Sequence, residues 1–143
     1  MARVDIEMPE DFLLKISRLG NDFDKIAESV LEAGAEVVLE KVKSNLSGVV
    51  GSNTKYKSRS TGELERSLGV SPVRLNNDGN YDVKIGFSES RPDGKNNAKL
   101  ANILEYGKHG QPAKPFLKPA KTASKKACVE TMKAKLEEEV KRL

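Results

Sequence analysis

The sequence has few of the residues that usually carry chemistry or covalent stabilisation. Its 143 residues include one cysteine, one histidine and no tryptophan. A lone cysteine, Cys128, forms no intramolecular disulfide and fits a reducing compartment. A histidine-based metal site or a Ser-His-Asp arrangement would depend on His109 alone, and no ligand spacing typical of zinc is present. These absences predict a protein that is not an enzyme, with no catalytic residues, no cofactor and no metal.

Long apolar runs are also missing. Only 37% of the residues are hydrophobic, and no stretch approaches the roughly 18 apolar residues of a membrane-spanning helix. The first residues, MARVDIEMPED, carry acids where a signal peptide needs an apolar run. We therefore expect a protein that folds in the cytosol as a single domain of residues 1–143, without membrane contact. Its thin core suggests a subunit that completes its burial against copies of itself.

Charge of each sign is concentrated in a different part of the chain. Residues 1–50 hold six Lys/Arg and ten Asp/Glu, a net charge of −4. Residues 51–113 hold ten against seven, or +3, and residues 114–143 hold nine against four, or +5. Two explanations stay open. In the first, the basic part of the chain faces the phosphates of a nucleic acid. In the second, the acidic face of one copy meets the basic face of its neighbour.

The periodicity predicts both strands and helices. Predicted strands cover residues 4–8, 69–76 and 80–87, and predicted helices cover 9–19, 22–46, 61–68, 98–106 and 116–143. Pro72 cannot donate a ladder hydrogen bond, which makes its strand an edge. Asp78-Gly79 suits a type I′ hairpin turn. Asn21 and Asn97 are predicted helix caps, and Gly107 is a predicted helix end. The last helix has an apolar stripe of Ala120, Ala123, Ala127, Cys128, Met132, Leu136 and Val140.

Between the second and third predicted helices lies a polar loop at 47–60, SGVVGSNTKYKSRS, which we expect to be mobile. It places Lys55, Lys57 and Arg59 around Tyr56. With the lysines of the last helix, this pattern supports an alternative function, a basic nucleic-acid-binding protein. The acidic N-terminal third and the absence of a recognised motif argue against that alternative.

Two segments carry a family resemblance: TGELERSLGV at 61–70 and LANILEYGKHGQPAKPFLKPA at 100–120. They resemble the small tail-completion, neck or head–tail joining proteins of long-tailed double-stranded DNA bacteriophages and prophages. The family's TG-x-L-x-x-S segment matches Thr61, Gly62, Leu64 and Ser67, and its E-[FY]-G turn matches Glu105, Tyr106 and Gly107. Its last motif matches Pro112, Ala113, Lys114, Pro115, Phe116, Leu117, Pro119 and Ala120. Lys108 departs from the pattern, since the family usually has Thr or Ser there.

The resemblance implies an α+β fold, an antiparallel sheet with an N-terminal helix pair and a long C-terminal helix packed on it. It also implies a non-enzymatic structural protein of the virion, with no catalytic residues and no cofactor. It would form a hexameric ring at the neck, between the head connector or head-completion protein and the tail-tube or tail-terminator protein. Basic residues lining such a ring are compatible with passing DNA. Whether the PAKPFLKPA stretch docks a helix within one subunit or contacts another stays open. The candidate interface residues are Lys55, Tyr56, Lys57, Arg59, Glu105, Tyr106, Gly107, Pro112, Pro115, Phe116, Leu117, Lys121 and Lys125.

Overall fold

A computed structural model describes residues 3–17, 23–49, 63–77, 79–88, 97–110 and 112–141. In these residues the chain forms four strands and five helices. The strands are β1 (Val4–Glu7), β2 (Leu68–Val70), β3 (Arg74–Leu75) and β4 (Tyr81–Phe87). The helices are α1 (Glu10–Ser17), α2 (Phe23–Val49), α3 (Glu63–Arg66), α4 (Asn97–Tyr106) and α5 (Leu117–Lys141). The predicted mixed α+β class, with a long C-terminal helix, is confirmed.

The sheet is antiparallel, and β4 is its central strand. Its order is β1-β4-β2, and β3 also pairs with β4. β1 aligns Val4 with Ile85 and Ile6 with Val83, so these four side chains lie on one face and are buried. The predicted alternation of the first strand is confirmed, because Val4, Ile6 and Met8 are buried while Asp5 and Glu7 are exposed.

The strand predicted at 69–76 is two short strands with a break between them. Val70 aligns with Ile85 but Arg74 aligns with Asp82, so the β2–β3 side has one more residue than β4 opposite it. Ser71 bridges the break. Its N–H donates to the Lys84 carbonyl at 2.8 Å, and its Oγ accepts from the Lys84 N–H at 2.9 Å. Pro72 follows directly, at the sheet edge where a missing N–H does no harm.

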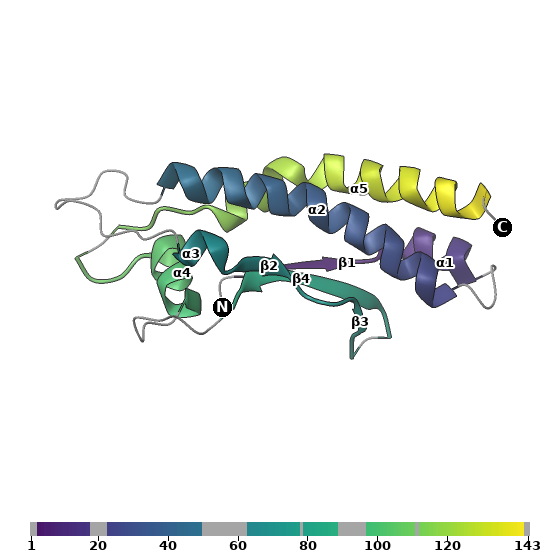
Figure 1. Cartoon of the computed structure of the whole chain (residues 1–143), viewed down its shortest axis with the longest axis horizontal. Coiled ribbons are helices and arrows are strands. Elements are labelled where there is room, and N and C mark those ends of the chain that lie inside the picture. The colour runs from purple at the N-terminus through teal and green to yellow at the C-terminus, as the bar shows by residue number, and fades with distance from the viewer. Residues whose placement is uncertain are drawn as a thin grey trace.

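Two long helices lie beside the sheet and dominate the molecule (Figure 1). α2 packs on the sheet and, along most of its length, on α5, which runs antiparallel to it. α5 also contacts β1. At a rise of about 1.5 Å per residue each helix is roughly 40 Å long. α1 precedes α2 and packs on it, which is the expected N-terminal helix pair. Among the described helices, none could cross a membrane.

The core runs continuously from β1 through α2 to α5, but the buried face of α5 differs from the predicted stripe. Its buried residues are Leu117, Ala120, Ser124, Cys128, Met132 and Leu136. Ala123 and Ala127 are exposed, and Val140 is 42% exposed. The prediction was wrong at these positions because small apolar residues follow two rows of the helix. Only the row from Ala120 to Leu136 faces α2.

α2 packs closely against α5 at Gly34. A Cβ built on Gly34 would lie 2.6 Å from Cγ of Met132 and 3.1 Å from Sγ of Cys128. Glycine at this position therefore lets the two helices pack closely, and it fixes which side of each helix faces the other.

Several predicted boundaries also shift. Leu68, predicted at the end of a helix, begins β2. α2 continues through Val49, so the first three residues of the predicted loop 47–60 are helical. Residues 50–62 lie outside the described residues, and with them Lys55, Tyr56, Lys57, Arg59, Thr61 and Gly62. Asn21, the predicted cap of α2, lies outside as well.

The predicted hairpin joins β3 to β4. Asn76 and Gly79 close a turn through a 3.1 Å bond from the Gly79 N–H to the Asn76 carbonyl, and Gly79 has a φ of 79°. This glycine is the fourth residue of the turn, whereas a type I′ turn has its residues of positive φ at the second and third positions. Asp78 lies outside the described residues.

Candidate assembly interface

The two motif segments at 105–107 and 112–120 meet at one carboxylate. Glu105, in the last turn of α4, is only 4% exposed, and its side chain lies at the start of α5. It accepts hydrogen bonds from the backbone N–H groups of Phe116 at 2.9 Å, Leu117 at 3.1 Å and Lys118 at 2.8 Å. A carboxylate at the positive end of a helix dipole is favourable, and burial strengthens the interaction.

This contact satisfies every amide that α5 leaves unpaired at its start. An α-helix has four N-terminal N–H groups without intrahelical acceptors. Three of them bond to Glu105, and the fourth position is Pro119, which has no N–H. The residue before the helix is Phe116, whose side chain cannot act as a cap. The cap of α5 therefore comes from another helix, eleven residues earlier in the chain.

The connection between α4 and α5 is held at further points. Gly107 ends α4 with a φ of 77°, and its N–H donates to the Ile103 carbonyl at 2.7 Å, which confirms the predicted helix end. The Lys114 N–H donates to the Leu104 carbonyl at 2.7 Å. Asn45 of α2 donates its amide to the Phe116 carbonyl at 3.3 Å. Three helices therefore meet at the start of α5.

Phe116 and Leu117 belong to the core of this subunit. Phe116 is fully buried and its ring meets that of Phe87, at the end of β4, edge to face with centroids 6.0 Å apart. Leu117 is 3% exposed. The PAKPFLKPA stretch therefore docks α5 within one subunit, which is the first of the two interpretations given above.

The other candidate residues that the structure describes lie at the surface. Tyr106 is 66% exposed, and Pro112, Pro115, Lys121 and Lys125 are exposed as well. His109 is exposed in the turn after α4. These side chains do not converge on one point. Among the described residues, no group of three or more His, Cys, Asp or Glu is placed to hold a metal ion.

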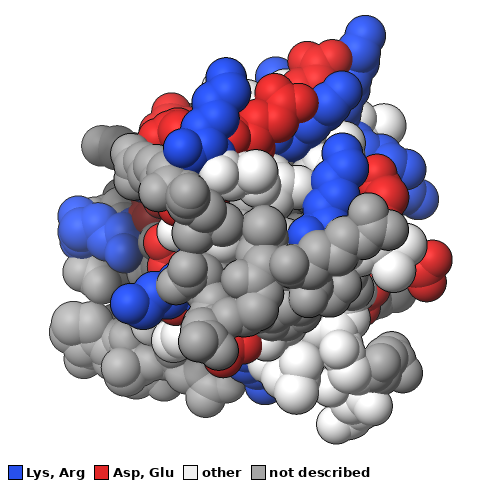
Figure 2. Space-filling view, turned by 90° about the vertical axis from the view of Figure 1, so that its right-hand side faces the viewer, with Lys and Arg blue, Asp and Glu red and all other residues white. Residues whose placement is uncertain are grey.

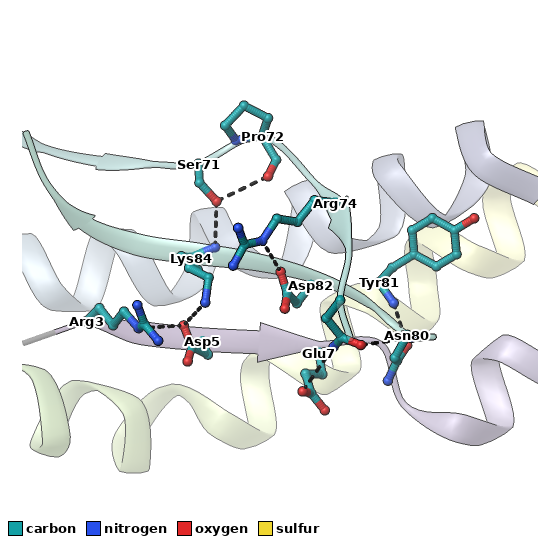
Figure 3. Close-up of polar contacts among 11 residues, drawn as sticks. Arg3, Asp5, Glu7, Ser71, Pro72, Arg74, Asn80, Tyr81, Asp82 and Lys84 are labelled. Carbon is teal, nitrogen blue, oxygen red and sulfur yellow. Dashed lines mark hydrogen bonds and ion pairs between the residues drawn. The ribbon is translucent and has the colours of Figure 1, made fainter. Parts of the chain in front are cut away.

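The outer face of the sheet carries a set of polar contacts (Figure 3). Lys84 of β4 pairs with Asp5 of β1 at 3.3 Å, and Arg3 meets the same carboxylate at 3.3 Å. Arg74 pairs with Asp82 at 3.4 Å. Asp82 is only 5% exposed, which its position on the polar face of the strand did not predict. These pairs compensate the charge on this face within the subunit.

Charge on the helices is distributed differently. At the end of the molecule near the α5 C-terminus, acidic and basic side chains are interleaved along the upper edge (Figure 2). There Lys135 pairs with Glu138 at 3.7 Å and Glu139 at 3.4 Å. Farther along the helices, glutamates follow one row of α2 with Lys25, Lys41 and Lys43 exposed near its ends, and lysines predominate on α5. Glu28, Glu32, Glu36 and Glu40 are exposed on α2, and Lys118, Lys121, Lys125, Lys126 and Lys133 are exposed on α5.

Two groups have shifted acidities. Desolvation, followed by the hydrogen bond and the negative charge of Asp24, raises the pKa of Tyr81 to about 12. The Tyr81 hydroxyl donates to the Asp24 carboxylate, which ties β4 to the start of α2. Burial raises the pKa of the Cys128 thiol. A thiol that is harder to ionise is a poorer nucleophile, which agrees with a packing role for Cys128.

Some of these roles were not predicted. Asn45 and the capping of α5 by Glu105 depend on contacts distant in sequence, and no local pattern signals them. Asn97 was predicted to cap α4, but it is the first residue of the helix, and its amide donates to the Ser88 carbonyl at 2.8 Å. Its Oδ1 is buried and accepts no hydrogen bond from the residues that the structure describes, so that cap prediction was wrong.

Comparison with known proteins gives one family. A family model named HK97-gp10_like and described as "Bacteriophage HK97-gp10, putative tail-component" matches residues 10–107. The matched range includes the TG-x-L-x-x-S and E-Y-G segments and ends before α5. No curated protein and no solved structure gives a significant match.

Proposed function

The chain belongs to the HK97-gp10-like family of phage tail components, and from this premise we propose that its copies form a ring at the head–tail junction of a long-tailed phage. In this role the protein is a non-enzymatic structural component of the virion, at the neck or the end of the tail. It is assembled in the cytoplasm of the bacterial host. The ring, hexameric in this proposal, joins a head-connector or head-completion protein to a tail-tube or tail-terminator protein.

The observation that carries the proposal is the family match, which covers both the motif-bearing α3–β2 region and α4. The fold supports it in a second way. α5 buries only a narrow row of side chains against α2 and exposes most of its surface. A long helix of this kind is suited to contact another protein.

The nucleic-acid-binding alternative receives less support from the geometry. Helix N-termini often bind phosphate through their free amides. At α5, the most basic helix, those amides are bonded to Glu105. Phosphate binding at the start of α5 would therefore depend on side chains rather than on backbone amides.

The test is removal of the coding sequence from the phage or prophage that encodes this chain, with the wild-type protein supplied in trans as the control. We expect separate heads and tails by negative-stain electron microscopy, and joined particles after complementation. Normally joined, infectious particles without the protein would overturn the proposal.

A further inference from the structure

Two exposed helix faces have opposite charge. On α2, Glu28, Glu32, Glu36 and Glu40 follow one another every four residues and form what we call the acidic ridge. On α5, Lys118, Lys121, Lys125 and Lys133 follow at spacings of three, four and eight and form the basic ridge. Val129 fills the gap in that spacing and is 40% exposed. Lys25 and Lys43 flank the ends of the acidic ridge, and Lys126 and Glu130 lie on another side of α5.

Neither ridge is compensated within the part of the chain that the structure describes. None of the eight ridge residues forms an ion pair there; the ion pairs on α5 join Lys135 to Glu138 and Glu139. Like charges at four-residue spacing on a helix repel one another. The acidic ridge would therefore gain from a basic surface supplied by another molecule.

The two ridges do not face each other in the subunit. Gly34 points at Met132 and Cys128 of α5. Glu32 and Glu36 are two residues before and after it, which at about 100° per residue turns them roughly 160° away. The acidic ridge therefore lies on the side of α2 opposite α5. On α5, the ridge residues Lys121 and Lys125 each follow a buried residue by one position, about 100° from the contact with α2.

We propose that the acidic ridge of one copy docks on the basic ridge of a second copy of this chain. The inference rests on the proposed function and identifies the surface through which its copies meet. The ridges are similar in length, about 18 Å for the twelve steps from Glu28 to Glu40 and about 22 Å for the fifteen steps from Lys118 to Lys133. Each copy has one acidic and one basic ridge on different sides. When the acidic ridge of one copy meets the basic ridge of a second, each copy keeps its other ridge free to bind a further copy. Such a heterologous contact repeats and closes a ring.

Two double variants test this contact. Glu32→Lys/Glu36→Lys reverses the two central charges of the acidic ridge, and Lys121→Glu/Lys125→Glu reverses two of the four charges of the basic ridge. We expect each variant alone to associate at least about tenfold more weakly than wild type at low ionic strength, measured by sedimentation velocity and native mass spectrometry. Mixed together, the two variants should assemble again, because each now offers the ridge that the other requires.

The matched controls change net charge equally at exposed positions outside the ridges: Glu10→Lys/Glu130→Lys and Lys15→Glu/Lys126→Glu. They should assemble like wild type. A wild type that stays monomeric at the highest attainable concentration, or ridge variants that assemble as well as their controls, would overturn the inference. The proposed function fails by a different result, joined particles without the protein, so the two failures are distinguishable.

Discussion

At the scale of single residues, the carboxylate of Glu105 is the clearest case of one side chain organising a large element. It is buried, and it accepts bonds from three consecutive amides at the start of a 25-residue helix. Its position in the E-Y-G segment next to Gly107 brings α4 to an end and starts α5 in the same place. The motif therefore has a structural explanation within one subunit.

Replacement of Glu105 with Gln should lower the free energy of unfolding by about 1–3 kcal/mol. Glutamine removes the negative charge and turns an NH₂ group toward amides that are themselves donors. Urea unfolding followed by circular dichroism measures the change. Glu137→Gln, an exposed residue of the same helix, serves as the control and should stay within about 0.5 kcal/mol of wild type. Equal effects of the two substitutions would contradict the capping role.

Tyr81 predicts a specific dependence on alkaline pH. Its pKa rises from 10.0 to about 12 in the folded protein, so the folded state holds this proton where the unfolded state has lost it. The stability from the Tyr81–Asp24 contact is complete below about pH 10 and is lost as the pH rises toward 12. The difference in stability between wild type and Tyr81→Phe should therefore shrink across this window.

Two measurements check this expectation. A tyrosinate absorbance titration should show a late step in wild type that Tyr81→Phe lacks, and urea midpoints of the two proteins should converge as the pH rises. A phenol at position 81 that titrates near 10 in the folded protein would refute the contact.

At the scale of elements, the pairing of α2 with α5 depends on how closely two helices approach. A Cβ on Gly34 would clash with Met132, and the buried row of small and medium side chains on α5 runs at four-residue spacing from Ala120 to Leu136. Because this row is buried in the subunit, the opposite side of α5 stays exposed and can contact other molecules.

Two glycines of α2 allow a matched test of this packing. Gly34→Ala should destabilise the protein by about 1–3 kcal/mol, toward the lower end because the Met132 side chain can adjust. Gly48→Ala should be neutral or stabilise by up to about 1 kcal/mol, since no atom lies within 4 Å of its added Cβ and alanine favours the helix. Thermal unfolding of both variants and of the wild type measures these changes in stability. Stabilisation by Gly34→Ala as well would show that the helices are not closely packed there.

At the scale of the whole molecule, the distribution of charge distinguishes self-assembly from nucleic-acid binding, the two functions that the composition allows. The basic part of the chain is a set of exposed lysines on α5, and the acidic part is exposed on α2 of the same molecule. A duplex is complementary to the lysines alone, whereas a second copy presents both signs and is complementary to both helices. The distribution favours self-assembly over nucleic-acid binding.

A DNA titration of wild type and of Lys121→Glu/Lys125→Glu at two salt concentrations tests this distinction. We expect weak binding by wild type, a small effect of the substitutions on it, and a large effect on self-assembly in parallel sizing experiments. Tight binding with a steep dependence on salt, reduced by the substitutions while assembly is unchanged, would support the nucleic-acid alternative instead.

The sequence by itself determined the features that depend on neighbours in the chain. Alternation predicted β1, the three- and four-residue spacing predicted α2, and Gly107 predicted the end of α4, because backbone geometry and local burial act over a few residues. Pro72 predicted an edge strand for the same reason. The family motifs, read as short patterns, also led to the phage assignment.

Only the tertiary structure decided what distant segments do to one another. Glu105 caps a helix that begins twelve residues later, Ser71 bridges a break in the strand that pairs with β4, and α5 buries one of its two rows of apolar residues. Each outcome is a choice among local alternatives of similar free energy. The choice is made by packing against a partner far along the chain, and no sequence window contains both sides of that contact.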